Sequence, residues 1–166
     1  ALPISSPLIF GGTGIDSVNQ NLPETIPERY EVASLNILAI SGLYAALKWI
    51  NNTGIEHIYQ TEKENHIRLI KILSKFDNIK IISPTNTDLG VGVVSCVFNG
   101  YSSDNIGQIL SDRNVAVRTG LHCAPFAHKF LGTFPAGTVR FSVSYFNSEN
   151  DFNCLETALE YINENS

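Results

Sequence analysis

Two long stretches of the chain carry apolar residues at the three- and four-residue spacing of an α-helix. In residues 36–51 the apolar positions are Ile37, Ile40, Leu43, Tyr44, Leu47 and Ile50. In residues 55–76 they are Ile55, Ile58, Tyr59, Ile67, Ile70, Leu73 and Phe76. We therefore expect two helices, separated by a break at Asn52-Thr53-Gly54.

After residue 78 the pattern changes to short β-branched runs, which are typical of strands. The predicted strands are 79–82, 90–98, 115–118 and 138–145. The predicted helices between and after them are 102–110, 124–131 and 148–162. This order of elements predicts a compact α+β domain from residue 53 onward. Residues 1–35 are rich in proline and glycine and show no periodicity, so we expect them to be irregular.

Composition narrows the class of protein. The chain has 166 residues, 43% of them apolar, with 11 Lys+Arg against 16 Asp+Glu and a net charge of −5. It can bury a sizeable core, and its mild acidity argues against nucleic acid as a partner. No apolar run approaches the roughly 18 residues that span a bilayer. The first residue is Ala1 rather than Met, which indicates processing or a piece of a longer chain.

The three cysteines have no metal-binding or disulfide spacing, so a reducing cytoplasm is the expected location. Cys123 lies in the polar run Arg118–Pro125, on a loop just before a predicted helix. A helix N-terminus and a nearby arginine would favour its nucleophilic thiolate. Alternatively, Cys123 is a small packed hydrophobe, the commoner fate of a free cysteine. Cys96 and Cys154 fall on apolar faces and are assigned to core packing.

Three other features could carry chemistry. His122, Cys123 and His128 are close in sequence, but adjacent ligands bind one ion awkwardly, so we predict no metal site. Arg140 sits in a predicted strand and needs a partner, either an acid of this chain or the carboxylate of a ligand. Ser34 precedes the first helix, where its hydroxyl could cap the helix or bind a phosphate, and capping is the simpler interpretation.

Four motifs, taken in order, resemble the C-terminal part of a cysteine desulfurase of the class V aminotransferase family, whose members use pyridoxal phosphate (PLP). The motifs are PLIFGGTG (7–14), PERYEVASLN (27–36), RTGLHCAP (118–125) and GTVRFSVSYFN (137–147). The resemblance implies the small C-terminal domain of a fold-type-I PLP enzyme, a short, mostly antiparallel sheet covered by helices. It assigns residues 53–166 to that domain and residues 1–52 to a strip of the large domain.

The resemblance also implies roles for individual residues. Cys123 matches the cysteine that takes sulfur from L-cysteine as a persulfide and passes it to an acceptor protein, leaving L-alanine. The implied catalytic residues are Cys123 and His122, the substrate-binding residues are Arg140 and Arg118, and the cofactor-binding residues are Ser34 and Thr13. Ser34 would reach the PLP phosphate of the partner subunit in a homodimer. The sulfur would serve pathways such as iron–sulfur cluster assembly.

This chain departs from the family pattern at three places. Leu121 stands where many members carry a second histidine, and Ala33-Ser34-Leu35 replaces Gly-Thr-Pro. No lysine has the Ser/Thr-x-His-Lys context of the residue that binds PLP, so we expect the chain alone to be inactive. A selenocysteine lyase, an aminotransferase or an epimerase of the same family is an alternative, as is a non-catalytic module that docks a partner.

Overall fold

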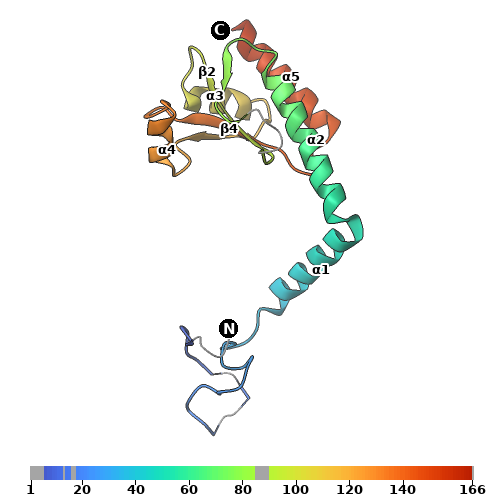
Figure 1. The fold of residues 1–166 in the computed structure, drawn as a ribbon, viewed down its shortest axis with the longest axis vertical. Helices are drawn as coiled ribbons and strands as arrows, with labels where there is room; N and C mark the ends of the chain where they lie inside the picture. Colours follow the sequence, from blue (N-terminus) through green and yellow to red (C-terminus); the bar gives the residue numbers. More distant parts are fainter. Residues whose placement is uncertain (1–5, 13, 16–17, 85–89, 166) are drawn as a thin grey trace. The chain divides into compact units, whose positions relative to one another are not determined.

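The structure, a computed structural model, describes residues 6–12, 14–15, 18–84 and 90–165. It consists of two compact units, residues 1–52 and 53–166 (Figure 1). In the first unit, helix α1 spans Ile37–Thr53, which confirms the helix expected there. The side chain of Asn36 caps it, because its Oδ1 accepts a hydrogen bond from the Ala39 N–H at 3.0 Å. The interpretation of Ser34 as the capping residue is therefore wrong.

The second unit is an α+β domain, as predicted. Its helices are α2 (Ile55–Leu73), α3 (Ser103–Ser111), α4 (Pro125–Phe130) and α5 (Glu149–Glu164). Its strands are β1 (Ile79–Ile81), β2 (Val93–Phe98), β3 (Arg118–Gly120) and β4 (Thr138–Ser142). They form one antiparallel sheet in the order β1-β2-β4-β3, so β4 lies between β2 and β3.

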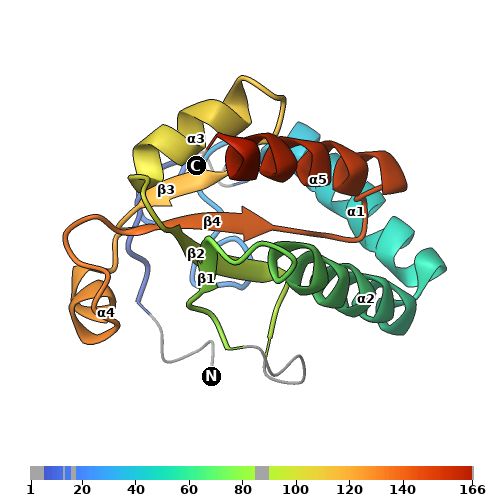
Figure 2. The same cartoon turned by 90° about the horizontal axis from the view of Figure 1, so that it is seen from above.

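One face of this sheet builds the core. The side chains of β2 and β4 alternate, and Val94, Cys96, Phe98, Val139 and Phe141 all point to the buried face. There they join the apolar stripes of α2, α3 and α5, whose buried residues belong to the same cluster. Helices α3 and α5 lie side by side over this face (Figure 2). Apolar burial on one face leaves the other face of the sheet available for polar side chains.

Polar contacts tie α5 to α2 and fix its start. Arg68 forms a two-pronged ion pair with Glu149 and places its guanidinium 4.3 Å from the Phe152 ring centroid. The start of α5 is a capping box, in which the Ser148 N–H donates to the Asp151 carboxylate at 2.7 Å. These contacts hold α5 in register against α2 at the far side of the core from the sheet.

Two expectations about this unit are wrong. The strand predicted at 115–118 begins only at Arg118, because the Val115 N–H still bonds the Leu110 carbonyl at 2.9 Å and so belongs to the turn that ends α3. Cys154 is exposed rather than packed in the core. On α5 the buried positions are Phe152, Leu155, Ala158, Leu159 and Ile162, and Cys154 lies between two of them on the opposite side. Cys96 is buried, as expected.

Candidate functional site

The loop that carries Cys123 is a tight turn from Leu121 to Ala124. The Ala124 N–H donates to the Leu121 carbonyl at 2.8 Å, and both central residues have positive φ, 49° at His122 and 60° at Cys123. This is the φ pattern of a type I′ turn, which glycine and asparagine favour. A left-handed conformation costs an L-residue about 1–2 kcal/mol. The turn therefore stores strain at the two residues that the sequence singled out.

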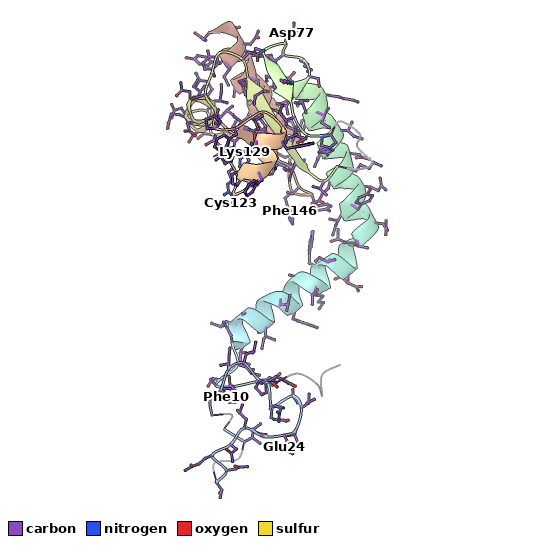
Figure 3. The ribbon with its side chains drawn as sticks, turned by 60° about the vertical axis from the view of Figure 1, so that its left-hand side comes forward. Phe10, Glu24, Asp77, Cys123, Lys129 and Phe146 are labelled. Carbon is purple, nitrogen blue, oxygen red and sulfur yellow. The ribbon has the colours of Figure 1, made fainter. Side chains whose placement is uncertain are left out.

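The turn presents the Cys123 sulfur to solvent, so the interpretation of Cys123 as a packed hydrophobe is wrong. Cys123 lies beside α4, and α4 lies beyond the end of the sheet where β4 begins (Figures 1 and 3). The Arg118 guanidinium donates to the Cys123 Sγ, with Nη2 at 3.7 Å. Cys96 offers a contrast, because burial raises the pKa of its thiol to about 12. Of these two cysteines, only Cys123 is placed to react.

Arg118 and Arg140 lie directly opposite each other in the β3–β4 pair, so their side chains share one face of the sheet. Ser95 flanks Arg140 on β2, and Thr138 precedes it on the same face of β4. We call this polar surface the arginine face and define it by Ser95, Arg118, Thr138 and Arg140. Like charges placed directly opposite in a sheet destabilise it.

Neither arginine forms an ion pair with an acidic residue in the part of the chain that the structure describes. The Nε of Arg140 is buried and has no hydrogen-bond partner. Of the two partners considered for Arg140, an acid of this chain is therefore not found among these residues. Two unneutralised guanidinium groups on one face form a site suited to an anion.

His122 lies at the edge of the arginine face. Its Nε2 is 3.0 Å from the Thr138 Oγ1, whereas its Nδ1 is buried without a partner. Burial lowers the pKa of His122, and the charges of Arg140, His128 and Arg118 lower it further. These effects outweigh a hydrogen bond to the Thr138 backbone, which raises the pKa, so the neutral imidazole is favoured. His128, on α4, is buried and bonds the Thr133 Oγ1 through its Nδ1 at 2.7 Å. The two histidine rings are 5.8 Å apart, centroid to centroid.

Two contacts that support the site could not be predicted from the sequence. Asp104, in the first turn of α3, accepts a hydrogen bond from the Thr119 hydroxyl at 2.9 Å and so anchors β3 next to Arg118. Gly137 has a φ of 76°, and a Cβ built on it would lie 2.3 Å from the Gly120 carbonyl. The backbone before β4 therefore packs directly against the end of β3. Both contacts join segments far apart in the sequence, so no local pattern could reveal them.

The remaining site candidates belong to the first unit. Ser34 is exposed and lies shortly before α1, and Thr13 lies outside the described residues. Among the described residues, no three histidine, cysteine or acidic side chains gather as a metal site would require. Likewise, no helix in the described ranges is long and apolar enough to cross a membrane.

Comparisons with known proteins converge on one family. A model of the aminotransferase class-V family matches residues 2–155. The chain is 30% identical over 156 residues to a probable cysteine desulfurase of Mycobacterium leprae and 31% identical over 169 residues to a cysteine desulfurase of Synechococcus elongatus. These matches cover 93% and 99% of this chain but only 37% and 26% of those proteins.

A solved structure gives the same result. The apo cysteine desulfurase of Thermococcus onnurineus superposes with a TM-score of 0.83 at 30% identity, over 96% of this chain and 40% of that protein. This likeness confirms the fold class that the sequence predicted. The chain thus spans well under half the length of the proteins it resembles.

Proposed function

The chain belongs to the aminotransferase class-V family, and from this membership we propose that it is the sulfur-accepting part of a PLP-dependent cysteine desulfurase. In this proposal residues 53–166 are the small C-terminal domain, and residues 1–52 are a strip of the large domain. The observation that carries it is the exposed Cys123 in a strained turn, beside two arginines with no acidic partner among the described residues. A cysteine placed for packing needs none of these features.

Cys123 is the proposed nucleophile. Its thiolate attacks the sulfur of the substrate L-cysteine, forming an S–S bond while the substrate's C–S bond breaks. The electron pair of that bond stays on carbon, which takes up a proton and becomes the methyl group of L-alanine. The products balance without an outside oxidant or reductant, and the sulfur remains on Cys123 as a persulfide anion.

In this proposal each arginine binds a different negatively charged group. Arg140, with its buried and unpartnered Nε, binds the carboxylate of the substrate. Arg118 contacts the Cys123 sulfur and binds the substrate's sulfur once it is transferred, because the persulfide carries a negative charge at the same place. The facing positions of the two residues on β4 and β3 keep the carboxylate site and the sulfur site next to each other.

Among the described residues, Ser34 supports a contact with the phosphate end of PLP. Ser34 has an exposed hydroxyl, and the cap of α1 is made by Asn36, so Ser34 is available for a phosphate. In the proposed homodimer Ser34 would bind the PLP phosphate of the partner subunit, and Thr13, which lies outside the described residues, would be a further cofactor-binding residue. When bound, PLP supplies the electron sink that makes the bonds of the amino acid breakable. No lysine here has the context expected of its covalent attachment site, so the chain alone is proposed to be inactive.

The test uses the complete protein that contains this chain. Cys123→Ser abolishes formation of L-alanine and sulfide from L-cysteine, whereas Cys154→Ser, at the other exposed cysteine, leaves it unchanged. Loss of activity in both variants, or in neither, would contradict the assignment of Cys123. If the Cys123→Ser protein instead processed another amino acid at the original rate, an aminotransferase or epimerase would be the better description. The 166-residue chain with added PLP is expected to form no L-alanine.

A further inference from the structure

Two buried polar atoms at the arginine face and its edge have no hydrogen-bond partner. They are the Nδ1 of His122 and the Nε of Arg140. A buried polar group without a partner costs roughly 1–3 kcal/mol, so two of them at one site call for an explanation. Arg140 belongs to the arginine face and His122 lies at its edge, and the described acids do not neutralise the positive charge of this face.

The two groups are held close together by β4. Thr138 and Arg140 are two residues apart on this strand, so their side chains leave the same face with a separation of about 7 Å along the strand. His122 is attached to the first of them through its Nε2 contact with the Thr138 hydroxyl. The charge of Arg140 is also among the causes that lower the pKa of His122, as expected for near neighbours.

The hydrogen bond made by the His122 Nε2 determines whether the Nδ1 of the same ring is a donor or an acceptor. A neutral imidazole has one N–H and one acceptor nitrogen. If the Thr138 hydroxyl donates to Nε2, the proton of the ring is on Nδ1, which is then a buried donor without a partner. The Nε of Arg140 is always a donor. One anion can then accept from both atoms.

We propose that His122 is a second ligand of the substrate carboxylate, whose oxygens accept hydrogen bonds from the His122 Nδ1–H and the Arg140 Nε–H together. This inference rests on the proposed function, since it names the group that the same site binds. It gives His122 a contact with the substrate and leaves the sulfur chemistry to Cys123 and Arg118. A carboxylate held from two sides is fixed in orientation as well as in position.

The tautomer of His122 is the first test. Long-range ¹H–¹⁵N spectra of the labelled chain identify which ring nitrogen carries the proton. We expect protonated Nδ1 and unprotonated Nε2 at neutral pH. A ring protonated at Nε2 would make Nδ1 an acceptor and overturn the proposal.

The second test measures propionate binding to the chain from the same spectra, in two matched variants. In His122→Asn the side-chain amide nitrogen takes the place of Nδ1, whereas in His122→Gln it takes the place of Nε2. We expect His122→Asn to keep the affinity within about threefold and His122→Gln to weaken it about tenfold or more, the range for a lost hydrogen bond to a charged group. Propionate should also shift the Arg140 Nε signal.

A role in holding the turn alone predicts the opposite order, because His122→Gln keeps the contact with Thr138 and His122→Asn does not. Equal affinities in both variants, or weaker binding in His122→Asn, would therefore overturn the inference. The proposed function fails separately, because it depends on alanine formation by the Cys123→Ser protein and not on propionate. A carboxylate site can pass its test while the sulfur assignment fails, and the reverse also holds.

Discussion

Gly137 sets the distance between the two strands that carry the arginines, and its replacement by alanine tests this geometry. Gly137 has a φ of 76°, and an added Cβ would lie 2.3 Å from the carbonyl carbon and oxygen of Gly120 and 2.6 Å from its Cα. All three are backbone atoms at the end of β3, so no side chain can rotate away. The backbone before β4 must move away from β3 to accommodate the methyl group.

The expected loss has two parts. An L-residue in the left-handed region costs about 1–2 kcal/mol, and forcing a methyl group into a packed contact adds about 1–3 kcal/mol. Gly137→Ala should therefore lower the free energy of unfolding by about 2–5 kcal/mol in total. Gly132 provides the matched control, because its φ is 71° and an added Cβ would meet nothing within 4 Å. Gly132→Ala should lose only the conformational part, about 1–2 kcal/mol.

Urea unfolding followed by far-ultraviolet circular dichroism measures both variants on the same chain. The difference between them, and not either loss alone, tests the contact between Gly137 and Gly120. Equal losses would refute the reasoning, since they would mean that the two strands do not approach as closely as the structure has them. A larger loss in Gly132→Ala would refute it as well.

Three further outcomes follow from the cysteine turn and from two histidines whose pKa is lowered by burial. Burial lowers the pKa of His66 and His122 from 6.5, so the unfolded chain binds more protons just below that pH. The free energy of unfolding in urea should therefore be highest above about pH 6.5 and fall as the pH drops below it. His66→Gln should reduce this dependence of stability on pH, and a stability that does not change with pH would contradict the reasoning. Iodoacetamide should modify Cys123 in the folded chain and spare Cys96, as peptide mass spectrometry will show; labelling of Cys96 before unfolding would contradict its burial. Arg118→Gln should lower the rate of Cys123 modification by iodoacetate relative to neutral iodoacetamide several-fold, and Arg118→Lys should keep most of the ratio, because the ratio reports the positive charge beside the sulfur. An unchanged ratio in Arg118→Gln would mean that Arg118 does not act on anions at this sulfur.

The helices were predictable from the sequence because their signal is local. The apolar stripe of residues 36–51 identifies α1 to within two residues at its C-terminal end, and the same holds for the start of α2 at Ile55. Strand β3 was placed three residues too early because Val115 and Val117 are β-branched and apolar. Their side chains do pack against the core, but the backbone there still closes the end of α3. The apolar character of a residue predicts that it is buried. Whether it belongs to a strand depends on hydrogen bonds to a neighbouring strand, which the local sequence does not reveal.

The sequence predicted where the candidate site lies better than it predicted the conformation and contacts of the site residues. Cys123 and Arg118 are five residues apart, and their proximity was anticipated. The left-handed turn was not, because His-Cys is not a sequence typical of turns with positive φ at both central residues. The contact of His122 with Thr138 spans 16 residues and depends on where β4 begins. Cys154 was misplaced for a related reason, since two apolar neighbours on a helix do not share a face when they are consecutive.

In the second unit, the apolar side chains that stabilise the fold and the polar side chains of the arginine face lie on opposite faces of one sheet. The helices bury Val94, Cys96, Val139 and Phe141 on one side, and this packing does not depend on the polar side chains across the sheet. The arginine face can therefore keep paired positive charges and unbonded donors that would be too unfavourable in a core. A bound anion would reduce the repulsion between the two arginines and would also supply hydrogen-bond acceptors. Its binding should therefore be favoured by both effects. In the proposed function, a small antiparallel sheet whose described core packs on one side would hold a charged substrate next to Cys123 on the other.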